Sequence, residues 1–239
     1  MVILLRKRDL MLSGVLCCFV LCFAAILWNG RAVPVFAAGE GKPVIVVVDP
    51  GHGGEDGGAV SSDGVKESDL NLAVSLRLYD LLRFAGQPSV LTRSEDVSIC
   101  DEGLGTIRQR KVSDLKNRVA LVNGLESAVM ISIHQNSLPS SAATHGAQAF
   151  CNRQEGADAL AEAIQIALNS GINAGNEKNP CRIPNDIYLM KNITAPGVLV
   201  ECGFLSNSLE TEQLQTPFYQ LRLAAAIAAG YLSCGLDAE

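Results

Sequence analysis

The sequence predicts an α/β fold: a three-layer domain in which a twisted, mostly parallel sheet is flanked by helices. Two observations predict it. From about Lys42 onward, strand-like apolar runs alternate with helix-like stretches, which is the order typical of a mostly parallel sheet. The first run, residues 44–48, is uninterrupted Val and Ile, as in a strand buried on both faces. The chain has no internal repeat and no low-complexity linker, so we expect one domain.

The first half of that domain holds three expected strands and two expected helices. The strand at 44–48 ends in a glycine-rich turn, and residues 68–85 follow as a helix with leucines at helical spacing and a Gly-Gln-Pro stop. A short strand is expected at 89–92. Residues 114–123 form a helix closed by Gly124, and the apolar run 128–133 forms the next strand.

The second half repeats the alternation. Residues 147–151 form a strand and residues 156–169 an amphipathic helix. Residues 170–184 are rich in Gly, Asn and Pro and predict an exposed loop. The apolar runs 187–190 and 198–201 predict two more strands, and residues 220–233 a terminal helix.

The N-terminal segment differs from this domain. Three basic residues at positions 6–8 precede an uncharged apolar run, residues 10–28, and a bilayer span needs about 20 such residues. The basic cluster predicts a cytoplasmic start, and residues 35–37 suit a signal peptidase. We therefore assign residues 1–38 to a signal peptide or an N-terminal membrane anchor and residues 39–239 to an exported domain. Contact with a membrane is expected only through the N-terminal segment.

Charge and cysteine content exclude some functions. Residues 1–37 carry four Lys or Arg and one Asp, so removing their net +3 changes the formal charge of −6 to −9. A domain this acidic is a poor binder of nucleic acid or anionic lipid. Five of the 8 cysteines lie beyond the apolar segment, widely spaced and without a CxxC pair, which does not indicate a disulfide framework. One bridge could form, and the pattern does not choose among Cys100, Cys151, Cys181, Cys202 and Cys234.

Metal-competent side chains follow three of the expected strands. His52 lies in the turn after the first strand, His134 follows 128–133, and Glu201 ends 198–201. Functional groups gather beyond the carboxyl ends of strands in open α/β sheets, and Glu67 adds a carboxylate just before a helix. Two imidazoles and one carboxylate are typical of a catalytic zinc site that leaves the fourth position for water. The remaining histidine, His145, is expected in a polar loop, solvated or at the rim of the site.

The glycine-rich turn after the first strand has a rival interpretation as a phosphate cradle. It lacks the GxGxxG spacing and a GK[ST], and it holds Glu55 and Asp56 where backbone amides would meet a phosphate. The glycines more plausibly let the backbone fold close around His52. Arg93 and Arg118 could hold a substrate carboxylate or a loop in place, but for both we expect ion pairs within the fold. For Asp49 we expect a role in fixing the turn.

Four motifs together resemble one enzyme family. VDPGHGG, KES, SIHQNS and VLVECGFLSN occur in order and with suitable spacing, and the match runs from about Val44 to Gly230. The sequence resembles the zinc-dependent N-acetylmuramoyl-L-alanine amidases of cell-wall lysis. The stretches TRSEDVSICDEGLGTIRQRKVSDLKNRVALVN, HGAQAF and DIYLMKNITAPGVLVECGFLSN are similar to the germination-specific amidases of endospore-forming bacteria.

The resemblance implies a role for each matched residue. His52, Glu67 and His134 would bind one Zn²⁺ per chain, and Glu201 would be the catalytic carboxylate. The substrate would be peptidoglycan, hydrolysed at the amide between N-acetylmuramic acid and L-alanine of the stem peptide. In the spore subgroup this step precedes muramic-lactam formation in the cortex, which implies location in the forespore envelope. Because the chain has no wall-binding repeat, anchoring or a helper protein could supply targeting or activation.

Two alternatives belong to other classes. Cys202, with His134 elsewhere, could make a thiol hydrolase. Adjacent positions of a strand face opposite sides, so Glu201 and Cys202 are not expected to share a site, and a buried inert thiol is the better interpretation. A non-catalytic peptidoglycan-binding module would have no need for Glu201.

Overall fold

The computed structural model of the chain describes residues 43–184 and 186–235. The strands are β1 (Ile45–Pro50), β2 (Ser89–Leu91), β3 (Ala128–Asn136), β4 (Gln148–Cys151), β5 (Cys181–Arg182) and β6 (Gly197–Phe204). The helices are α2 (Glu67–Phe84), α3 (Ile107–Asn123), α4 (Ala157–Gly171), α5 (Tyr188–Asn192), α6 (Ser208–Leu214) and α7 (Pro217–Cys234), with a short 3₁₀ turn η1 (Pro139–Ser141).

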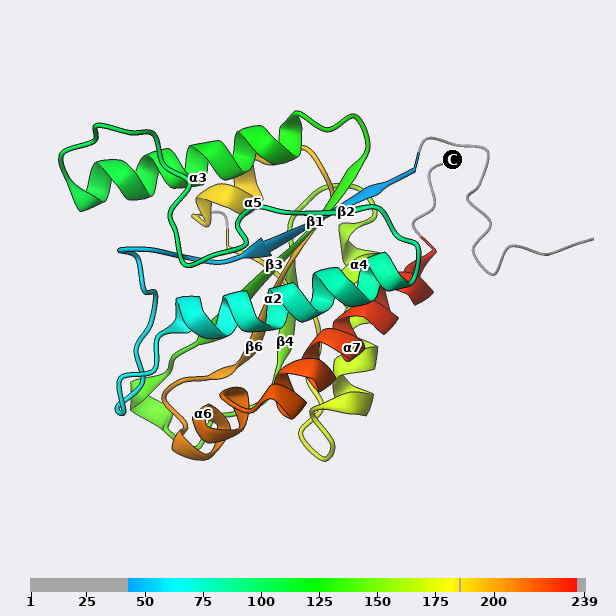
Figure 1. The fold of residues 1–239 in the computed structure, drawn as a ribbon. Helices are drawn as coiled ribbons and strands as arrows, with labels where there is room; N and C mark the ends of the chain where they lie inside the picture. The colour runs from blue at the N-terminus through cyan, green and yellow to red at the C-terminus, as the bar shows by residue number, and fades with distance from the viewer. Residues whose placement is uncertain (1–42, 185, 236–239) are drawn as a thin grey trace, which may run out of the picture. The chain divides into compact units, whose positions relative to one another are not determined.

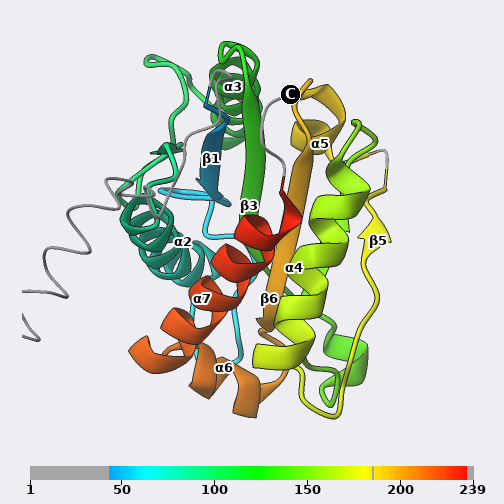
Figure 2. The same ribbon diagram turned by 90° about the vertical axis from the view of Figure 1, so that its right-hand side faces the viewer.

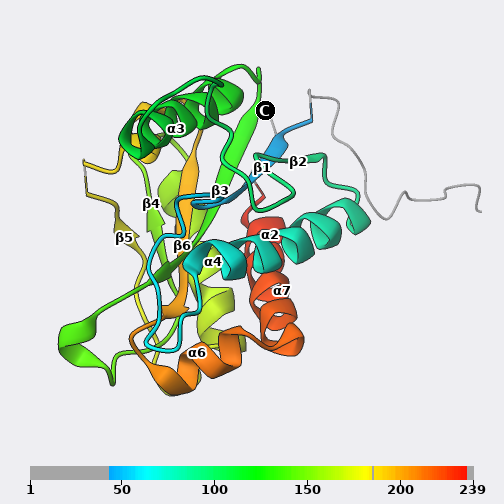
Figure 3. The same ribbon diagram turned by 60° about the vertical axis from the view of Figure 1, so that its left-hand side comes forward.

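The described strands form one mixed sheet in the order β2-β1-β3-β6-β4-β5. Strands β2, β1, β3 and β6 are mutually parallel, whereas β4 runs antiparallel to β6 and parallel to β5. The carboxyl ends of β1, β3 and β6 therefore meet at one edge of the sheet. Figure 3 shows the chain leaving β1 (blue) at this edge and running to the start of α2 (cyan).

Helices cover both faces of the sheet, as the three-layer prediction requires (Figures 1 and 2). Side chains of α2, α4 and α7 pack with alternate residues of the central strands, among them Val46, Ile131 and Val200, in the larger core. The opposite strand positions, among them Val47 and Met130, pack with α3 and α5 in a smaller core. The fold class predicted from the sequence is confirmed.

Several element boundaries differ from those expected. Residues 187–190 are not a strand: Tyr188–Asn192 is helical, because it packs against α3 rather than beside another strand, and a short apolar run is typical of either element. The expected loop 170–184 contains the edge strand β5. Helix α3 begins seven residues earlier than position 114, because Thr106 and Gln109 form a capping box. Helix α6, capped by Asn207, was not expected.

The expected leader, residues 1–38, lies outside the described residues. No helix in the described part of the chain is long and apolar enough to cross a membrane. The cysteines at positions 100, 151, 181, 202 and 234 are all free thiols. The disulfide that the sequence left open is therefore not formed among the described residues.

Candidate metal centre

His52, Glu67 and His134 converge at the carboxyl edge of the sheet. His52 follows β1, Glu67 is the first residue of α2, and His134 lies in β3. One donor atom from each lies within 4.8 Å of the others. Oε1 of Glu67 is 3.3 Å from Nε2 of His52 and 2.9 Å from Nδ1 of His134. Zinc–ligand bonds of about 2.0–2.2 Å in a tetrahedron separate donor atoms by about 3.3 Å, so this spacing suits such an ion.

The carboxylate of Glu67 is held by main-chain and side-chain donors. The amide of Ala59 donates to Oε2 at 2.8 Å, and the amide of Gln135 donates to Oε1 at 3.1 Å. The side chain of Asn71, one helical turn along α2, donates to Oε1 at 3.3 Å. Burial of the carboxyl opposes ionisation, but hydrogen bonds to His134 and His52 outweigh it and hold the pKa of Glu67 well below its usual range. Glu67 is thus ionised and fixed in place. The contact of Asn71 with Glu67 was not predicted, although the i, i+4 spacing of the two residues on one helix face indicates it.

His52 occupies an unusual backbone conformation. Its φ is 60°, the only positive φ of a non-glycine residue in the described ranges. The guanidinium of Arg118 donates to its carbonyl oxygen at 2.8 Å from α3. Burial of the imidazole opposes protonation, but hydrogen bonds to Asp56 and Glu67 outweigh it and raise the pKa of His52 to about 9. Arg118 thus holds the unusual backbone of His52 from outside the turn. Residues in sparsely populated φ/ψ regions need such support.

Two buried arginines support the turn that carries His52. Arg118 pairs with Asp49 and with Asp114, which confirms the expected ion pairs. Asp49 also accepts from Thr92 and Ser132, each at 2.6 Å, and thus fixes the end of β1 as expected.

Arg93 behaves differently from Arg118. It donates to the carbonyl oxygens of Pro50, Gly51 and Ser68 at 2.9–3.1 Å, so it fixes the main chain instead of forming the ion pair predicted for it. The carbonyl oxygens at the end of β1 accept its donors because the strand ladder has ended there.

Two glycines of the turn pack against the candidate ligand side chains. A Cβ on Gly51 would lie 2.3 Å from the imidazole of His134, and one on Gly58 would lie 2.5 Å from Oε2 of Glu67. Real Cβ atoms do not approach this closely, so the backbone packs directly on the ligand set. The Cβ on Gly58 would also lie 2.8 Å from Cδ2 of His52, so the prediction that small residues let the turn close around His52 is confirmed.

Glu201 lies beside the cluster on the neighbouring strand. It pairs with His134 in the β3–β6 register. Its Oε2 atom is buried and has no hydrogen-bond partner among the described residues. Burial raises the pKa of Glu201 to about 7. A half-buried glutamate whose carboxyl has a buried, unpartnered oxygen and a pKa near neutrality is suited to proton transfer.

Cys202 is excluded from the site. It is fully buried in the larger core, on the face of the sheet opposite to Glu201, and burial raises the pKa of its thiol. A thiolate nucleophile is therefore disfavoured there, as the strand alternation predicted.

Two cavities open at this end of the fold. One of about 300 Å³ is bordered by His52 and is lined further by Val97, Ile107, Arg110 and Lys111, among others. Four acidic side chains share this wall with the two cations, and two of the acids pair with them, so the wall carries no excess of positive charge. Of the four predicted site residues, His52 alone lines this cavity.

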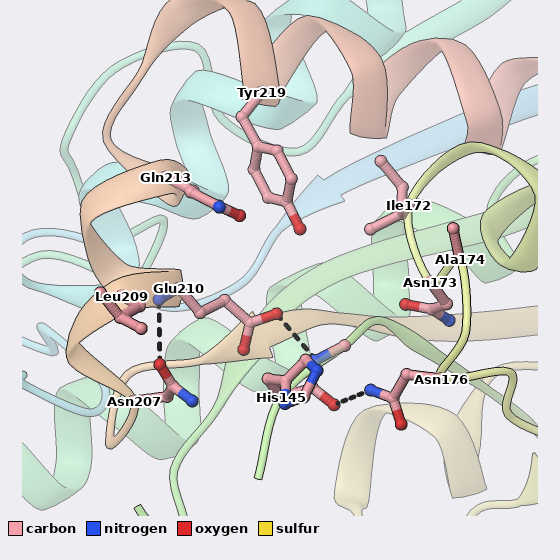
Figure 4. Close-up of a pocket in the computed structure, with 11 residues that line it drawn as sticks. His145, Ile172, Asn173, Ala174, Asn176, Asn207, Leu209, Glu210, Gln213 and Tyr219 are labelled. Atoms are coloured by element: carbon pink, nitrogen blue, oxygen red, sulfur yellow. Dashed lines mark hydrogen bonds between the residues drawn. The ribbon is translucent and has the colours of Figure 1, made fainter. Parts of the chain in front are cut away.

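The second cavity, of about 260 Å³, lies among the loop before β4, the end of α4 and helices α6 and α7 (Figure 4). Exposed His145 lines it, so that histidine is apart from the metal cluster, as predicted. The carboxylate of Glu210 points into the same region and accepts from the amides of Gly146 and Phe204 at 2.8 and 2.7 Å. None of the four predicted site residues lines this cavity.

Comparison with known proteins places the chain in a family. The family model described as N-acetylmuramoyl-L-alanine amidase matches residues 46–232. The chain is 40% identical over 206 residues to the germination-specific N-acetylmuramoyl-L-alanine amidase of Bacillus subtilis, covering 86% of this chain and 83% of that protein. It is 27% identical over 248 residues to the amidase AmiA of Escherichia coli, covering 86% and 80% respectively.

Among solved structures, the CwlD amidase of Clostridioides difficile in complex with the GerS lipoprotein matches with a TM-score of 0.75 and 35% identity, over 80% of this chain and 98% of that one. Fold, motifs and relatives agree over nearly the whole described region. The chain belongs to the N-acetylmuramoyl-L-alanine amidase family and is a peptidoglycan-hydrolysing enzyme of that class.

Proposed function

We propose that the enzyme is a zinc amidase that cleaves the bond between N-acetylmuramic acid and L-alanine with His52, Glu67 and His134 as metal ligands and Glu201 as the proton carrier. One observation carries the proposal most strongly. Three nitrogen and oxygen donors face one another within 4.8 Å, and a buried carboxyl with a free oxygen lies on the adjacent strand.

The donor chemistry fits zinc. Two imidazoles and one carboxylate are a common protein set for catalytic Zn²⁺. A bound zinc ion supplies Lewis-acid polarisation of the substrate carbonyl and lowers the pKa of water from 15.7 to about 7. The chain's own contribution is to orient the donor atoms. Ala59, Gln135 and Asn71 all donate hydrogen bonds to the carboxylate of Glu67 and fix it in place.

Glu201 would move the proton. Amide hydrolysis needs a base that takes a proton from water and an acid that gives one to the departing nitrogen. The pKa of Glu201, raised to about 7 by burial, suits both steps near neutral pH. Its Oε2, without a hydrogen-bond partner among the described residues, is available to accept that proton. These properties support its assignment as the catalytic carboxylate.

The cavity beside His52 would accept part of the substrate. Val97 and Ile107 offer apolar contacts, while Arg110 and Lys111 are paired with Glu55 and Asp56 in the same wall. The methyl groups of a stem peptide would suit the apolar part of this wall. His52 borders the cavity, so a peptide bound there would lie beside the proposed metal site.

The biological setting is proposed from the relatives. The B. subtilis relative is named germination-specific, which supports action on spore-cortex peptidoglycan before muramic-lactam formation in the forespore envelope. The C. difficile relative was solved with a lipoprotein, which supports a helper protein for targeting or activation of this enzyme. We further propose that residues 1–38 are a signal peptide or membrane anchor that exports the catalytic domain, residues 39–239.

Digestion of purified peptidoglycan tests the reaction. We expect free stem peptides that begin with L-alanine and glycan strands that stay uncut. Chelation should abolish release, and added zinc should restore it. New reducing sugar ends without released peptide would show that another bond is cleaved, and full activity in metal-free protein would remove zinc from the proposal.

A further inference from the structure

Asp56 lies on the side of the His52 ring that is turned away from Glu67. Its Oδ2 atom is 2.9 Å from Nδ1 of His52, while Nε2 of the same ring faces Glu67 at 3.3 Å. The two ring nitrogens therefore have different partners. A metal-bound imidazole is neutral, so one that donates Nδ1–H to a carboxylate presents the lone pair of Nε2 on its other side.

The carboxylate of Asp56 is itself held in place. Nζ of Lys111, in α3, lies 3.0 Å from the same Oδ2 atom. Oδ1 is directed to the amide of Gly58 in the turn, at the longer distance of 3.4 Å. Helix α3 thus contacts the turn around His52 at several points, among them Lys111 with Asp56 and Arg118 with the main chain of His52.

We propose that Asp56 is a positioning residue that fixes the tautomer and orientation of His52, so that Nε2 is presented to the metal, and that Lys111 sets Asp56 in turn. The inference rests on the proposed zinc site and adds residues beyond its ligands. Carboxylates that accept from a metal-bound imidazole are worth about 10–100-fold in metal affinity or activity.

The adjacent residue provides a matched control. Glu55 is also acidic, lies in the same turn and pairs with a cation of α3, Arg110, at 2.7 Å. Among the hydrogen bonds and ion pairs of the described residues, none joins Glu55 to His52. A purely structural tie between the turn and α3 would therefore make Glu55 and Asp56 comparable, whereas positioning of the imidazole involves Asp56 alone.

Zinc affinity of the full-length chain tests the inference, measured by competition with a chromophoric chelator. Asp56→Ala should weaken zinc binding about 10–100-fold, and Glu55→Ala should leave it unchanged. Asp56→Asn keeps an oxygen acceptor without the charge, so its loss should be intermediate. Lys111→Met should give a smaller loss than Asp56→Ala. Thermal unfolding of each metal-free variant shows whether the fold is intact.

A second readout uses the wild-type chain alone. Nitrogen-15 NMR of the zinc-loaded protein should show that Nδ1 of His52 carries the proton. A proton on Nε2, or equal zinc affinity in Asp56→Ala and Glu55→Ala, would overturn the role of Asp56 while leaving the zinc site intact. A wild-type chain that binds no zinc would overturn the proposed function and this inference with it.

Discussion

Glu67 and Glu201 are carboxylates at the same edge of the sheet, and both lie next to His134. Glu67 accepts hydrogen bonds from Ala59, Gln135 and Asn71, and its pKa is held well below its usual range. Glu201 has an Oε2 atom without a partner among the described residues, and burial raises its pKa to about 7. The carboxyl of Glu67 is thus kept ionised, whereas the carboxyl of Glu201 has a pKa close to neutral pH.

The difference comes from where each side chain starts. Glu67 opens α2, so the amides of Ala59, in the preceding loop, and of Gln135, at the irregular end of β3, reach its oxygens. Two imidazoles lower its pKa. Glu201 projects from the interior of β6, where the amides are engaged in the sheet ladder and none turns toward the side chain. Enzymes commonly assign two carboxylates to different tasks through such environments. Under the proposed function, these environments suit Glu67 to metal binding and Glu201 to proton transfer.

Loss of a ligand should have the largest effect. His134→Ala removes one of three donors, so both zinc content and peptidoglycan hydrolysis should fall to the level of the chelator-treated enzyme. Metal analysis and peptide release measure the two together. His145→Ala is the control, because His145 lies in the second cavity, and it should retain both. Normal zinc content in His134→Ala would remove that residue from the metal centre.

Overpacking the turn should have the next largest effect. Gly51→Ala places a Cβ 2.3 Å from the imidazole of His134 and should cost about 1–3 kcal/mol of unfolding free energy and weaken zinc binding. Gly57→Ala, in the same turn, meets only the Lys66 side chain at 3.5 Å and should cost no more than about 0.5 kcal/mol. Chemical denaturation and zinc titration compare them; equal losses would mean that the turn does not pack on the ligand as described.

Glu201 should make the metal-free enzyme less stable at higher pH. Its pKa is raised from 4.5 to about 7, so between these values the folded state keeps a proton that the unfolded state releases. Stability contributed by this residue is therefore highest below pH 4.5 and falls as pH rises to about 7, by up to about 3 kcal/mol. Glu201→Gln should lose this slope and be more stable than wild type at pH 8. Parallel stability–pH curves for the two proteins would contradict a buried, poorly compensated carboxyl.

The thiol on the other face of β6 should have the smallest effect. Cys202 is fully buried and its pKa is raised, so iodoacetamide should modify exposed Cys181 first and leave turnover unchanged. Cys202→Ala should cost about 1 kcal/mol of stability without loss of activity. Mass spectrometry of the alkylated sites, read beside the assay, checks this. Inactivation that tracks modification of Cys202 would favour a thiol mechanism.

The site residues at strand ends could be predicted because parallel strands bring their carboxyl ends together. His52, His134 and Glu201 each follow or end an apolar run, and that pattern depends only on local sequence. Glu67 was found from its place at a helix start and from the family resemblance. The roles of Arg93 and Asp56 could not be found in this way. They depend on which carbonyl or ring nitrogen lies nearby after folding, and no periodicity encodes that contact.

The helices and strands that were predicted wrongly also have local causes. The apolar run that became α5 is too short to distinguish a strand from a helix, and packing against α3 decided it. The start of α3 could have been predicted from Thr106 and Gln109, a capping-box pair that was overlooked. The antiparallel direction of β4 follows from connection geometry, which residue types do not record.

A paired measurement on Glu67→Gln and Glu201→Gln tests the division between the two carboxylates most directly. Both changes keep side-chain size and remove the charge, and each variant is analysed for zinc per chain and for peptide release from peptidoglycan. We expect Glu67→Gln to lose zinc and activity together, and Glu201→Gln to keep about one zinc while turnover falls about 10²–10⁴-fold. Zinc loss in Glu201→Gln as large as in Glu67→Gln would make Glu201 a ligand, and retained zinc with near-normal turnover would make it structural.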